Sequence, residues 1–435
     1  MAKHLIVVSA DALVFEDLEF AKDLPVLGKM MKEGAQIQRV RTIYPTLTHP
    51  VHASIMTGCP AGETTIVANE EFCPGQLERP WFNHIDQVKC ETIFHAAHRA
   101  GLTTAACRWP VTAGGGDVID YLVPEVMGLD MRGHEDDPAS VYRALGTSEC
   151  VMDIVEEALA KYGCGNAHPD YDEFEMWAAA QIIRRYQPNV LFCHPGHIDG
   201  ERHRTGLFTD PVKESVALTD KWLAMLLDAV KEAGIQDETD FVVLSDHGHL
   251  NICRTVCPNV FLHDAGYIQC DEEGNITHWD AYIGSCALSA HVYLSDPEDK
   301  ELYESVAELL YAMADEKLYG FEQVFTREEV KERYGLDGDF SFVIETDGFT
   351  TFADDWNRPV VRDLDTSDYR FGHSTHGHMP EKGPQPTFLG MGPSFKKGAV
   401  VAEGHILNHA PTFAKILDVE LPQAKGKAEE ELLNL

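Results

Sequence analysis

Acidic and imidazole side chains recur in short motifs along this chain of 435 residues. Asp246 and His247 lie side by side in Ser-Asp-His-Gly-His, directly after an apolar run. Asp199 and His203 stand four residues apart, a spacing that lets both reach one ion from a loop or a single helical turn. Adjacent carboxylate and imidazole donors suit zinc or a similar transition ion. Together these motifs predict a metal site, although the first alone is also compatible with a capped helix start and a surface histidine, and the second with a solvated polar loop.

A second histidine-rich stretch lies near the C-terminus, where residues 372–378 read Gly-His-Ser-Thr-His-Gly-His. It offers three imidazoles, from His373, His376 and His378, and its glycines permit tight backbone turns. An exposed, flexible histidine-rich loop is the alternative interpretation of this composition.

Thr46 and Thr48 are candidates for a nucleophile in the segment Tyr-Pro-Thr-Leu-Thr-His-Pro-Val-His. A threonine hydroxyl needs a base or a metal to lower its pKa before it can attack. Pro50 favours the start of a helix, which would place Thr48 at the positive end of the helix dipole, where phosphoryl oxygens dock. Both threonines also suit a simple capping role.

Three apolar, β-rich runs position these motifs. Residues 5–10 end at Asp11, residues 189–194 lead into the loop with Asp199, and residues 241–245 end at Asp246. A helical apolar pattern covers residues 211–234. Strands that alternate with helices predict an α/β fold with a parallel sheet, in which ligands bind beyond the carboxyl ends of the strands. We therefore expect the three acids to converge on one crevice.

The length exceeds the roughly 250–300 residues that one hydrophobic core supports, so a substantial insertion is expected. Residues 267–361 lack the strand-then-acid pattern and contain charged helical runs at 296–317 and 326–334. We predict that they form an inserted α+β cap, while residues 1–266 and 362–435 form the metal-binding catalytic core. Aromatic cap residues suit either nucleobase stacking or core packing: Phe342, Phe349, Phe352 and Trp356.

The charge and the cysteines restrict the partners and the location. With 71 acidic and 35 basic side chains, the formal net charge of −36 disfavours binding to a nucleic-acid polymer. A small anionic substrate remains compatible with this net charge, because bound divalent cations dominate their local field.

The N-terminal apolar run is too short for a signal peptide, and no apolar run approaches the ~18 residues that span a bilayer. Eleven cysteines without a paired C-x-x-C spacing suit reduced thiols. These features predict a cytoplasmic protein without a membrane anchor, and leave homo-oligomerisation open.

In this order, the segments resemble the type I phosphodiesterase/nucleotide pyrophosphatase family of the alkaline phosphatase superfamily. The shared features are an Asp after the first strand, Pro-Thr-x-Thr-x-Pro, Asp-x-x-x-His, Ser-Asp-His-Gly and a late His-Gly. The resemblance implies an α/β/α sandwich with a mostly parallel central sheet and an inserted cap. It also implies a two-metal hydrolase that cleaves phosphodiester or nucleotide pyrophosphate bonds of a small phosphorylated substrate through a phosphothreonine intermediate. Zinc is the metal expected, with manganese or iron as alternatives.

The resemblance assigns roles to residues of this chain. One ion would be held by Asp199, His203 and His376, and the other by Asp11, Asp246, His247 and Thr48. The family pattern favours Thr48 over Thr46 as the nucleophile, and Asn69 matches an asparagine that donates a hydrogen bond to a phosphoryl oxygen. Trp109, followed by a proline, matches a family Trp-Pro and is interpreted as structural.

Departures from the family pattern border the expected substrate pocket. Val51 stands where asparagine is usual, Thr64 and Thr65 replace His-Gly, and His249 replaces a common methionine. His249 is either a contact to the ligands or substrate, or a passive replacement, and the roles of His373 and His378 stay open.

The identity of the phosphorylated substrate is left open among several classes. The absence of an arginine adjacent to Thr48 or Asn69 favours a diester, a nucleotide pyrophosphate or a phosphonate over a dianionic monoester, unless Arg202 or Arg204 supplies the charge. A phosphonoacetate hydrolase would need basic groups such as Lys89 or Arg108. A phosphomonoesterase, a metal-dependent phosphosugar mutase and a non-catalytic metal-binding protein are the remaining alternatives.

Overall fold

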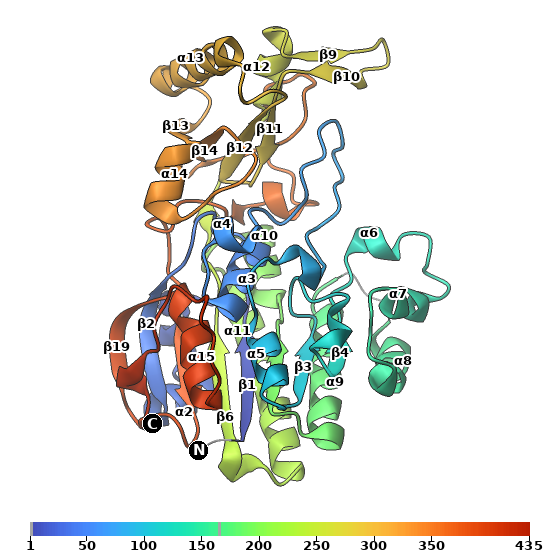
Figure 1. Ribbon diagram of the computed structural model, residues 1–435, viewed down its shortest axis with the longest axis vertical. Coiled ribbons are helices and arrows are strands. Elements are labelled where there is room, and N and C mark those ends of the chain that lie inside the picture. The colour runs from blue at the N-terminus through green and yellow to red at the C-terminus, as the bar shows by residue number, and fades with distance from the viewer. Residues whose placement is uncertain (1–2, 164–166) are drawn as a thin grey trace.

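The computed structural model describes residues 3–163 and 167–435. Its core is an eight-stranded sheet in the order β19-β2-β18-β6-β1-β5-β3-β4, with helices on both faces (Figure 1). Strand β18 runs antiparallel to both neighbours, and the other pairs are parallel, which confirms the predicted α/β fold. The strands are β1 His4–Ser9, β2 Ala35–Arg41, β3 Thr104–Cys107, β4 Tyr121–Val123, β5 Val190–Cys193, β6 Thr239–Leu244, β18 Phe388–Met391 and β19 Val400–His405.

Strands β6, β1 and β5 lie next to one another and correspond to the three predicted apolar runs. Val7 of β1 pairs with Phe192 of β5 and Val242 of β6, and every residue of the three strands is buried. Because parallel strands end at the same edge of a sheet, the segments that follow them meet there. The predicted convergence of the three acid-bearing segments is therefore confirmed.

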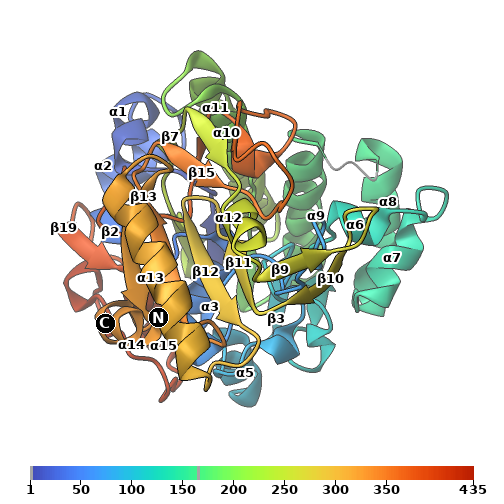
Figure 2. The same cartoon turned by 90° about the horizontal axis from the view of Figure 1, so that it is seen from above.

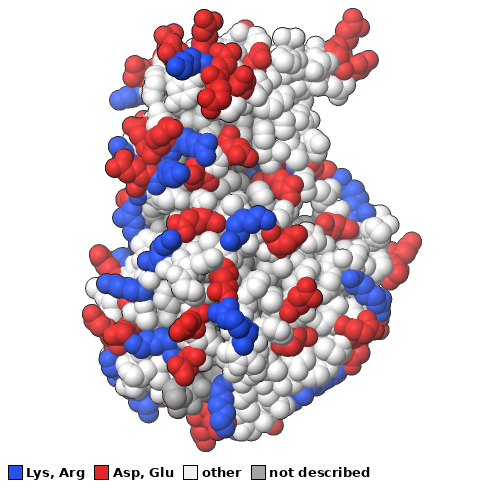
Figure 3. Space-filling model, viewed as in Figure 1, with Lys and Arg blue, Asp and Glu red and all other residues white. Residues whose placement is uncertain are grey.

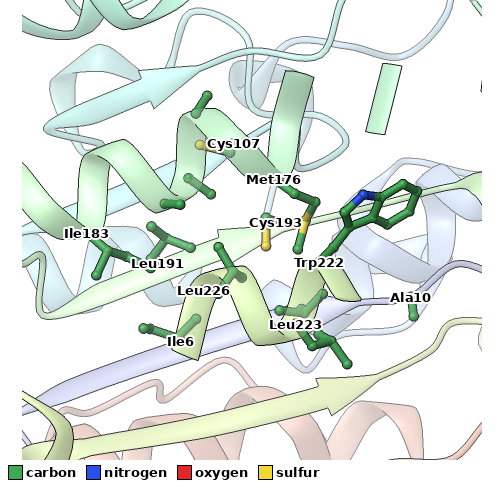
Figure 4. Packing of buried hydrophobic residues seen from close by; sticks show 14 of the residues in the cluster. Ile6, Ala10, Cys107, Met176, Ile183, Leu191, Cys193, Trp222, Leu223 and Leu226 are labelled. Atoms are coloured by element: carbon green, nitrogen blue, oxygen red, sulfur yellow. The ribbon is translucent and has the colours of Figure 1, made fainter. Parts of the chain in front are cut away.

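Two helices, α9 (Asp170–Tyr186) and α11 (Asp210–Glu232), lie on one face of the sheet. Figure 4 shows Ile6 and Leu191 on the strands close to Leu223 and Leu226 of α11, all within one hydrophobic cluster. Complete burial of a leucine side chain stabilises a fold by roughly 1.5–3 kcal/mol. Helix α11 confirms the helix predicted at 211–234.

The opposite face is covered by α3 (Thr48–Thr57), α5 (Ile93–Arg99) and α15 (His409–Leu417). Leu5 and Val7 face this second cluster, whereas Ile6 and Val8 face the first. This alternation follows from the two-residue period of a strand, and it buries β1 on both sides. The start of α3 thus lies beside the edge where the strands end.

Residues 267–361 lie mostly above this edge (Figures 1 and 2). A four-stranded antiparallel sheet in the order β11-β12-β14-β13 carries α13 and α14, which confirms the two predicted helical runs. Two further strands, β15 and β16, flank β8 of the preceding segment, and the 267–361 boundaries stay a prediction. The elements are β8 Arg254–Val256, α12 Asn259–Asp264, β9 Ile268–Cys270, β10 Ile276–Trp279, β11 Ala281–Ser285, β12 Ser289–Leu294, α13 Lys300–Glu316, β13 Phe321–Thr326, α14 Arg327–Tyr334, β14 Phe342–Thr346, β15 Thr350–Phe352 and β16 Val361–Arg362.

The four cap aromatics separate into two groups. Phe342, Phe352 and Trp356 are buried in the hydrophobic cluster of the cap, whereas Phe349 is 64% exposed. Core packing, rather than stacking on a ligand, accounts for the three buried rings.

The surface and the cysteines agree with the composition. On the face shown in Figure 3, Lys and Arg are scattered among Asp and Glu. The ten cysteines in the described part of the chain are free thiols. Within residues 3–163 and 167–435, no helix combines the length and apolarity needed to span a bilayer. The cellular location stays a prediction.

Candidate metal centre and active site

The histidine-rich stretch is fixed beside the strand ends by backbone contacts. The N–H of His373 donates to the carbonyl of His203 at 2.7 Å, and β17 (Ser374–Thr375) pairs with β7 (Leu250–Asn251). A Cβ on Gly372 would lie 2.2 Å from the His203 carbonyl oxygen, and Gly377 has a φ of +94°. Gly372 and Gly377 therefore permit the tight backbone path that was predicted for this stretch. The flexible-loop alternative is wrong for His376 and His378, which are buried, while His373 is exposed.

We call Asp199, His203, His249 and His376 the histidine-rich cluster, because their ligand atoms all lie within 4.8 Å of one another. Helix α10 (His197–Thr205) places Asp199 and His203 one turn apart, with Asp199 Oδ2 3.2 Å from His203 Nε2. Asp199 Oδ1 lies 2.6 Å from His249 Nε2 and 3.8 Å from His376 Nε2. The predicted set of Asp199, His203 and His376 is thus brought together, with His249 added.

Backbone carbonyls orient two imidazoles of this cluster. His203 Nδ1 donates to the carbonyl of Ser374 at 2.8 Å, and His376 Nδ1 donates to the carbonyl of Thr46 at 3.0 Å. A carbonyl can only accept, so the neutral rings carry their lone pairs on Nε2, toward Asp199. Burial lowers the pKa of His376 well below its usual value, which keeps that ring neutral. This is the protonation pattern that metal ligation requires.

We call Asp11, Asp246 and His247 the carboxylate-rich cluster. His247 Nε2 lies 3.2 Å from Asp246 Oδ2 and 3.6 Å from Asp11 Oδ1. The other oxygen of each acid is fixed: Asp11 Oδ2 accepts from His194 Nε2 at 3.0 Å, and Asp246 Oδ1 accepts from the Ala12 N–H at 3.2 Å. Asp11 Oδ1 and Asp246 Oδ2 accept no hydrogen bond. Each acid therefore has one anchored oxygen and one left for another partner.

The electrostatics of the two acids indicate what that partner is. Burial, and then the neighbouring Asp246 charge, raises the pKa of Asp11 well above its ordinary range. Burial also raises the pKa of Asp246 to about 6. Buried carboxylate oxygens without partners are costly unless a cation or a proton compensates them. Carboxylates together with neutral imidazoles form a donor set that fits a divalent transition ion.

The two clusters adjoin. The ligand atoms of Asp11, Asp199 and His247 also lie within 4.8 Å of one another. The rings of His247 and His376 stack with their centroids 3.9 Å apart. The residues therefore fit two neighbouring cations, as the resemblance implies.

Thr48 is the first residue of α3, and its Oγ1 lies 3.2 Å from His247 Nε2. Thr46 is turned elsewhere, because its Oγ1 accepts a hydrogen bond from the Gly377 N–H at 3.0 Å. The structure thus separates the two candidates and places Thr48 against the carboxylate-rich cluster. His52 supports this turn, since its Nδ1 donates to the Thr48 carbonyl at 2.7 Å.

Asn69 is buried and lines the same cavity as Thr48. Its Oδ1 accepts from the N–H of His49, the second residue of α3, at 2.9 Å. Because this donor fixes the amide oxygen, Nδ2 remains as a donor for a ligand. This orientation is compatible with the predicted role of Asn69.

The cavity at the strand ends has a volume of about 580 Å³, within the range of small-molecule sites. Asp11 of the carboxylate-rich cluster and Asp199, His203 and His376 of the histidine-rich cluster line it. The lining also includes residues that the sequence did not indicate: His49, Trp81, Glu125, Val126, Met127, His168 and Tyr171. His49 Nε2 lies 3.2 Å from Glu125 Oε2, and its ring meets Trp81 edge-on. His49 directly follows Thr48, so its place in the sequence could have indicated that it lies in the cavity wall. The other residues of the wall lie in distant segments without a motif.

The basic candidates have other partners. Arg202 is buried and pairs with Asp17, and Arg204 is exposed at the cavity rim, where it pairs with Glu201. Among the described residues, Arg204 is the only Lys or Arg that lines this cavity.

Lys89 and Arg108 lie outside the cavity lining. The Lys89 ammonium donates to the Asp86 carbonyl beside another pocket, and Arg108 lies buried against the ring of Tyr171. Trp109 packs against His52 and Phe192, which agrees with its structural interpretation.

The family model for type I phosphodiesterase/nucleotide pyrophosphatase matches residues 5–378. The chain belongs to this family. The human ectonucleotide pyrophosphatase/phosphodiesterase family member 1 is 25% identical over 232 residues, which cover 52% of this chain and 21% of that protein. Human member 5 is 22% identical over 252 residues, covering 57% of this chain and 45% of that protein. The chain thus matches less than half the length of these relatives.

Solved structures of relatives share the fold. Murine ectonucleotide pyrophosphatase/phosphodiesterase 5, as an inactive variant in complex with AMP, superposes with a TM-score of 0.68 at 19% identity, over 99% of both chains. The human protein 5 gives a TM-score of 0.67 at 18% identity. These neighbours support the alkaline-phosphatase-like architecture.

Proposed function

We propose that this family member hydrolyses phosphodiester or nucleotide pyrophosphate bonds with Thr48 as its nucleophile. The observation that carries the proposal is the position of the Thr48 hydroxyl, at the start of α3 and 3.2 Å from His247, in a cavity that members of both ligand clusters line. The histidine-rich cluster would hold one divalent cation and the carboxylate-rich cluster, with Thr48, the other. Zinc is the proposed metal, with manganese or iron as alternatives.

Two cations held there would supply Lewis acidity, by lowering the pKa of the nucleophile and neutralising charge on the phosphoryl oxygens. The chain supplies the rest. Thr48 Oγ gives up its proton to solvent and attacks phosphorus, and the bond from phosphorus to the leaving alcohol or phosphate oxygen breaks. The position of Thr48 at the N-terminus of α3 places the phosphoryl group at the positive end of the helix dipole. Asn69 Nδ2 donates a hydrogen bond to a non-bridging oxygen as negative charge builds there. Water then releases the phosphoryl group from Thr48, so two in-line displacements give net retention at phosphorus.

The charge of the cavity supports a diester over a monoester. Arg204, the basic side chain on the described lining, is exposed and already paired with Glu201. Glu125 adds an acid to the wall. A dianionic monoester would meet these carboxylates without a buried guanidinium, whereas a diester carries one negative charge fewer.

The size and lining of the cavity support a nucleotide-like substituent. The rings of Trp81 and Tyr171 contribute to the wall, and aromatic faces suit stacking on a base. The murine relative was solved in complex with AMP, which agrees with this substrate class.

A substrate panel tests the proposal. We would compare bis-p-nitrophenyl phosphate, thymidine 5'-p-nitrophenyl phosphate, p-nitrophenyl phosphate and phosphonoacetate with the zinc-loaded protein. The nucleotide diester should be turned over faster than the monoester, and Thr48→Ala should reduce turnover by about 10³-fold or more.

Thr46→Ala is the matched control, because the Gly377 N–H also donates to the Thr46 carbonyl at 2.9 Å and keeps that contact. This control should retain most of the activity. Preference for the monoester or for phosphonoacetate would overturn the substrate class, and full activity of Thr48→Ala would overturn the mechanism.

A further inference from the structure

His249 occupies an unusual place beside the histidine-rich cluster. It is fully buried, and its ring centroid lies 4.4 Å from that of His203 and 5.0 Å from that of His376. Its Nε2 lies 2.6 Å from Asp199 Oδ1, and its Nδ1 lies 3.1 Å from Ser374 Oγ. These two contacts determine which nitrogen of the neutral ring is protonated.

The hydrogen bonds of Ser374 determine the tautomer of His249. Its hydroxyl has one hydrogen, which it donates to the carbonyl of Arg202 at 2.7 Å. Ser374 Oγ can therefore only accept from His249, so Nδ1 of His249 is the protonated nitrogen. In the neutral ring the lone pair then lies on Nε2, as in His203 and His376.

This tautomer leaves a mismatch at the cluster. The Nε2 lone pair of His249 faces a carboxylate oxygen of Asp199 at 2.6 Å, and two acceptors at this distance repel each other. Either a proton or a cation must lie between or beside them. Three imidazoles fixed through Nδ1 and one carboxylate thus converge on one point, with all four ligand atoms within 4.8 Å.

We propose that His249 is a fourth protein ligand of the cation at the histidine-rich cluster. The inference rests on the proposed function, since it concerns the same two-cation site. With His249, that cation has three imidazole ligands and one carboxylate, in place of the three-ligand set of Asp199, His203 and His376. Zinc with four protein ligands is usually closed to substrate, whereas catalysis needs an open position. The ion at this cluster must therefore accept at least five ligands, which zinc does when it expands its coordination and which cobalt, manganese and iron do readily.

Counting the coordinated imidazoles tests the inference directly. In a Co²⁺-loaded protein, the proton on Nδ1 of each coordinated histidine gives a strongly shifted, solvent-exchangeable NMR signal. We expect four such signals, from His203, His376, His249 and His247, and three in His249→Met. The affinity for Co²⁺ at this cluster should also fall by about tenfold or more.

Two variants make the result specific. His249→Gln should also show three signals, because an amide can still hydrogen-bond Asp199 but gives no imidazole resonance; it serves if the methionine variant does not fold. His373→Ala, which removes an exposed imidazole of the same stretch, should keep four.

The possible failures are distinguishable. Two bound Co²⁺ with the same number of signals in wild type and His249→Met would overturn the role of His249 alone. Fewer than two Co²⁺ per chain in the wild type would overturn the two-cation proposal, and this inference with it.

Discussion

The histidine-rich and carboxylate-rich clusters adjoin, yet their acids have opposite surroundings. Burial would raise the pKa of Asp199, but the charge of a proton shared with His203 or His249 would hold it well below its ordinary range. In the other cluster, burial raises the pKa of Asp11 strongly and that of Asp246 to about 6. Without a cation, the carboxylate-rich cluster therefore has excess negative charge, whereas the histidine-rich cluster turns the Nε2 lone pairs of its imidazoles toward a single acid.

The clusters also differ in how the fold builds them. Asp11 and Asp246 follow neighbouring parallel strands, so the sheet itself sets their separation. The histidine-rich cluster instead combines α10 with two loops, tied by the contact of His373 with His203 and by the pairing of β17 with β7. One cluster is therefore set by sheet register and the other by long-range loop contacts.

The largest effect is expected at Asp199, the acid that lies close to both clusters. Asp199→Asn should reduce kcat/KM by about 10³-fold or more, because the uncharged amide weakens binding of the cation at the histidine-rich cluster. Metal analysis should find one tightly bound ion per chain in place of two. A variant with normal metal content and activity within tenfold of wild type would show that the two clusters do not work as a unit.

A smaller effect is expected at Asn69, which lines the same cavity as Thr48 and whose amide oxygen accepts from the His49 N–H. Asn69→Ala should lower kcat by about 10²–10³-fold, the usual cost of removing one oxyanion donor, with both ions retained. Asn69→Asp is the matched variant, since it keeps an oxygen for the His49 N–H but offers no donor. Near-normal kcat in either variant would contradict the assigned role.

The smallest effect is expected on the free energy of unfolding when no metal is bound. It is measured in Asp246→Asn, which changes the carboxylate-rich cluster alone. The folded pKa of Asp246, about 6, lies above its ordinary value of 3.8. The folded chain therefore binds more protons between these values, and its stability falls as pH rises through this window. Asp246→Asn removes this loss, so in chelator at pH 7 it should be more stable than wild type by about 1–3 kcal/mol.

Denaturant unfolding at two pH values checks this prediction. The advantage of Asp246→Asn should disappear near pH 4, where the wild-type carboxyl is protonated, and should reverse when metal is added, because only the wild type gains binding energy at that cluster. A wild-type protein that is the more stable one in chelator at pH 7 would contradict the charge imbalance.

Much of the backbone could be predicted from the sequence, because local periodicity determines it. The runs that became β1, β5 and β6 are apolar throughout, as strands buried on both faces must be. Helix α11 shows its apolar stripe in the same direct way. The acids after the strands could also be predicted to converge, since parallel strands end at one edge.

The walls of the cavity could not be predicted, because they depend on contacts between distant segments. Glu125 pairs with His49 from a loop 76 positions later, and Ser374 fixes the tautomer of His249 from 125 positions away. Nothing in the local pattern around Glu125 or Tyr171 indicates a ligand-facing side chain. The proposed metal ligands lie in recognisable sequence motifs, whereas the residues of the cavity wall are brought together only by the fold.

The stereochemistry at phosphorus tests the central claim most directly. A thymidine 5'-(p-nitrophenyl phosphorothioate) of known configuration would be hydrolysed in ¹⁸O-enriched water, and the configuration of the product would be determined. Attack by Thr48 followed by attack of water predicts net retention. Inversion would show that water attacks phosphorus directly and would contradict the nucleophilic role of Thr48.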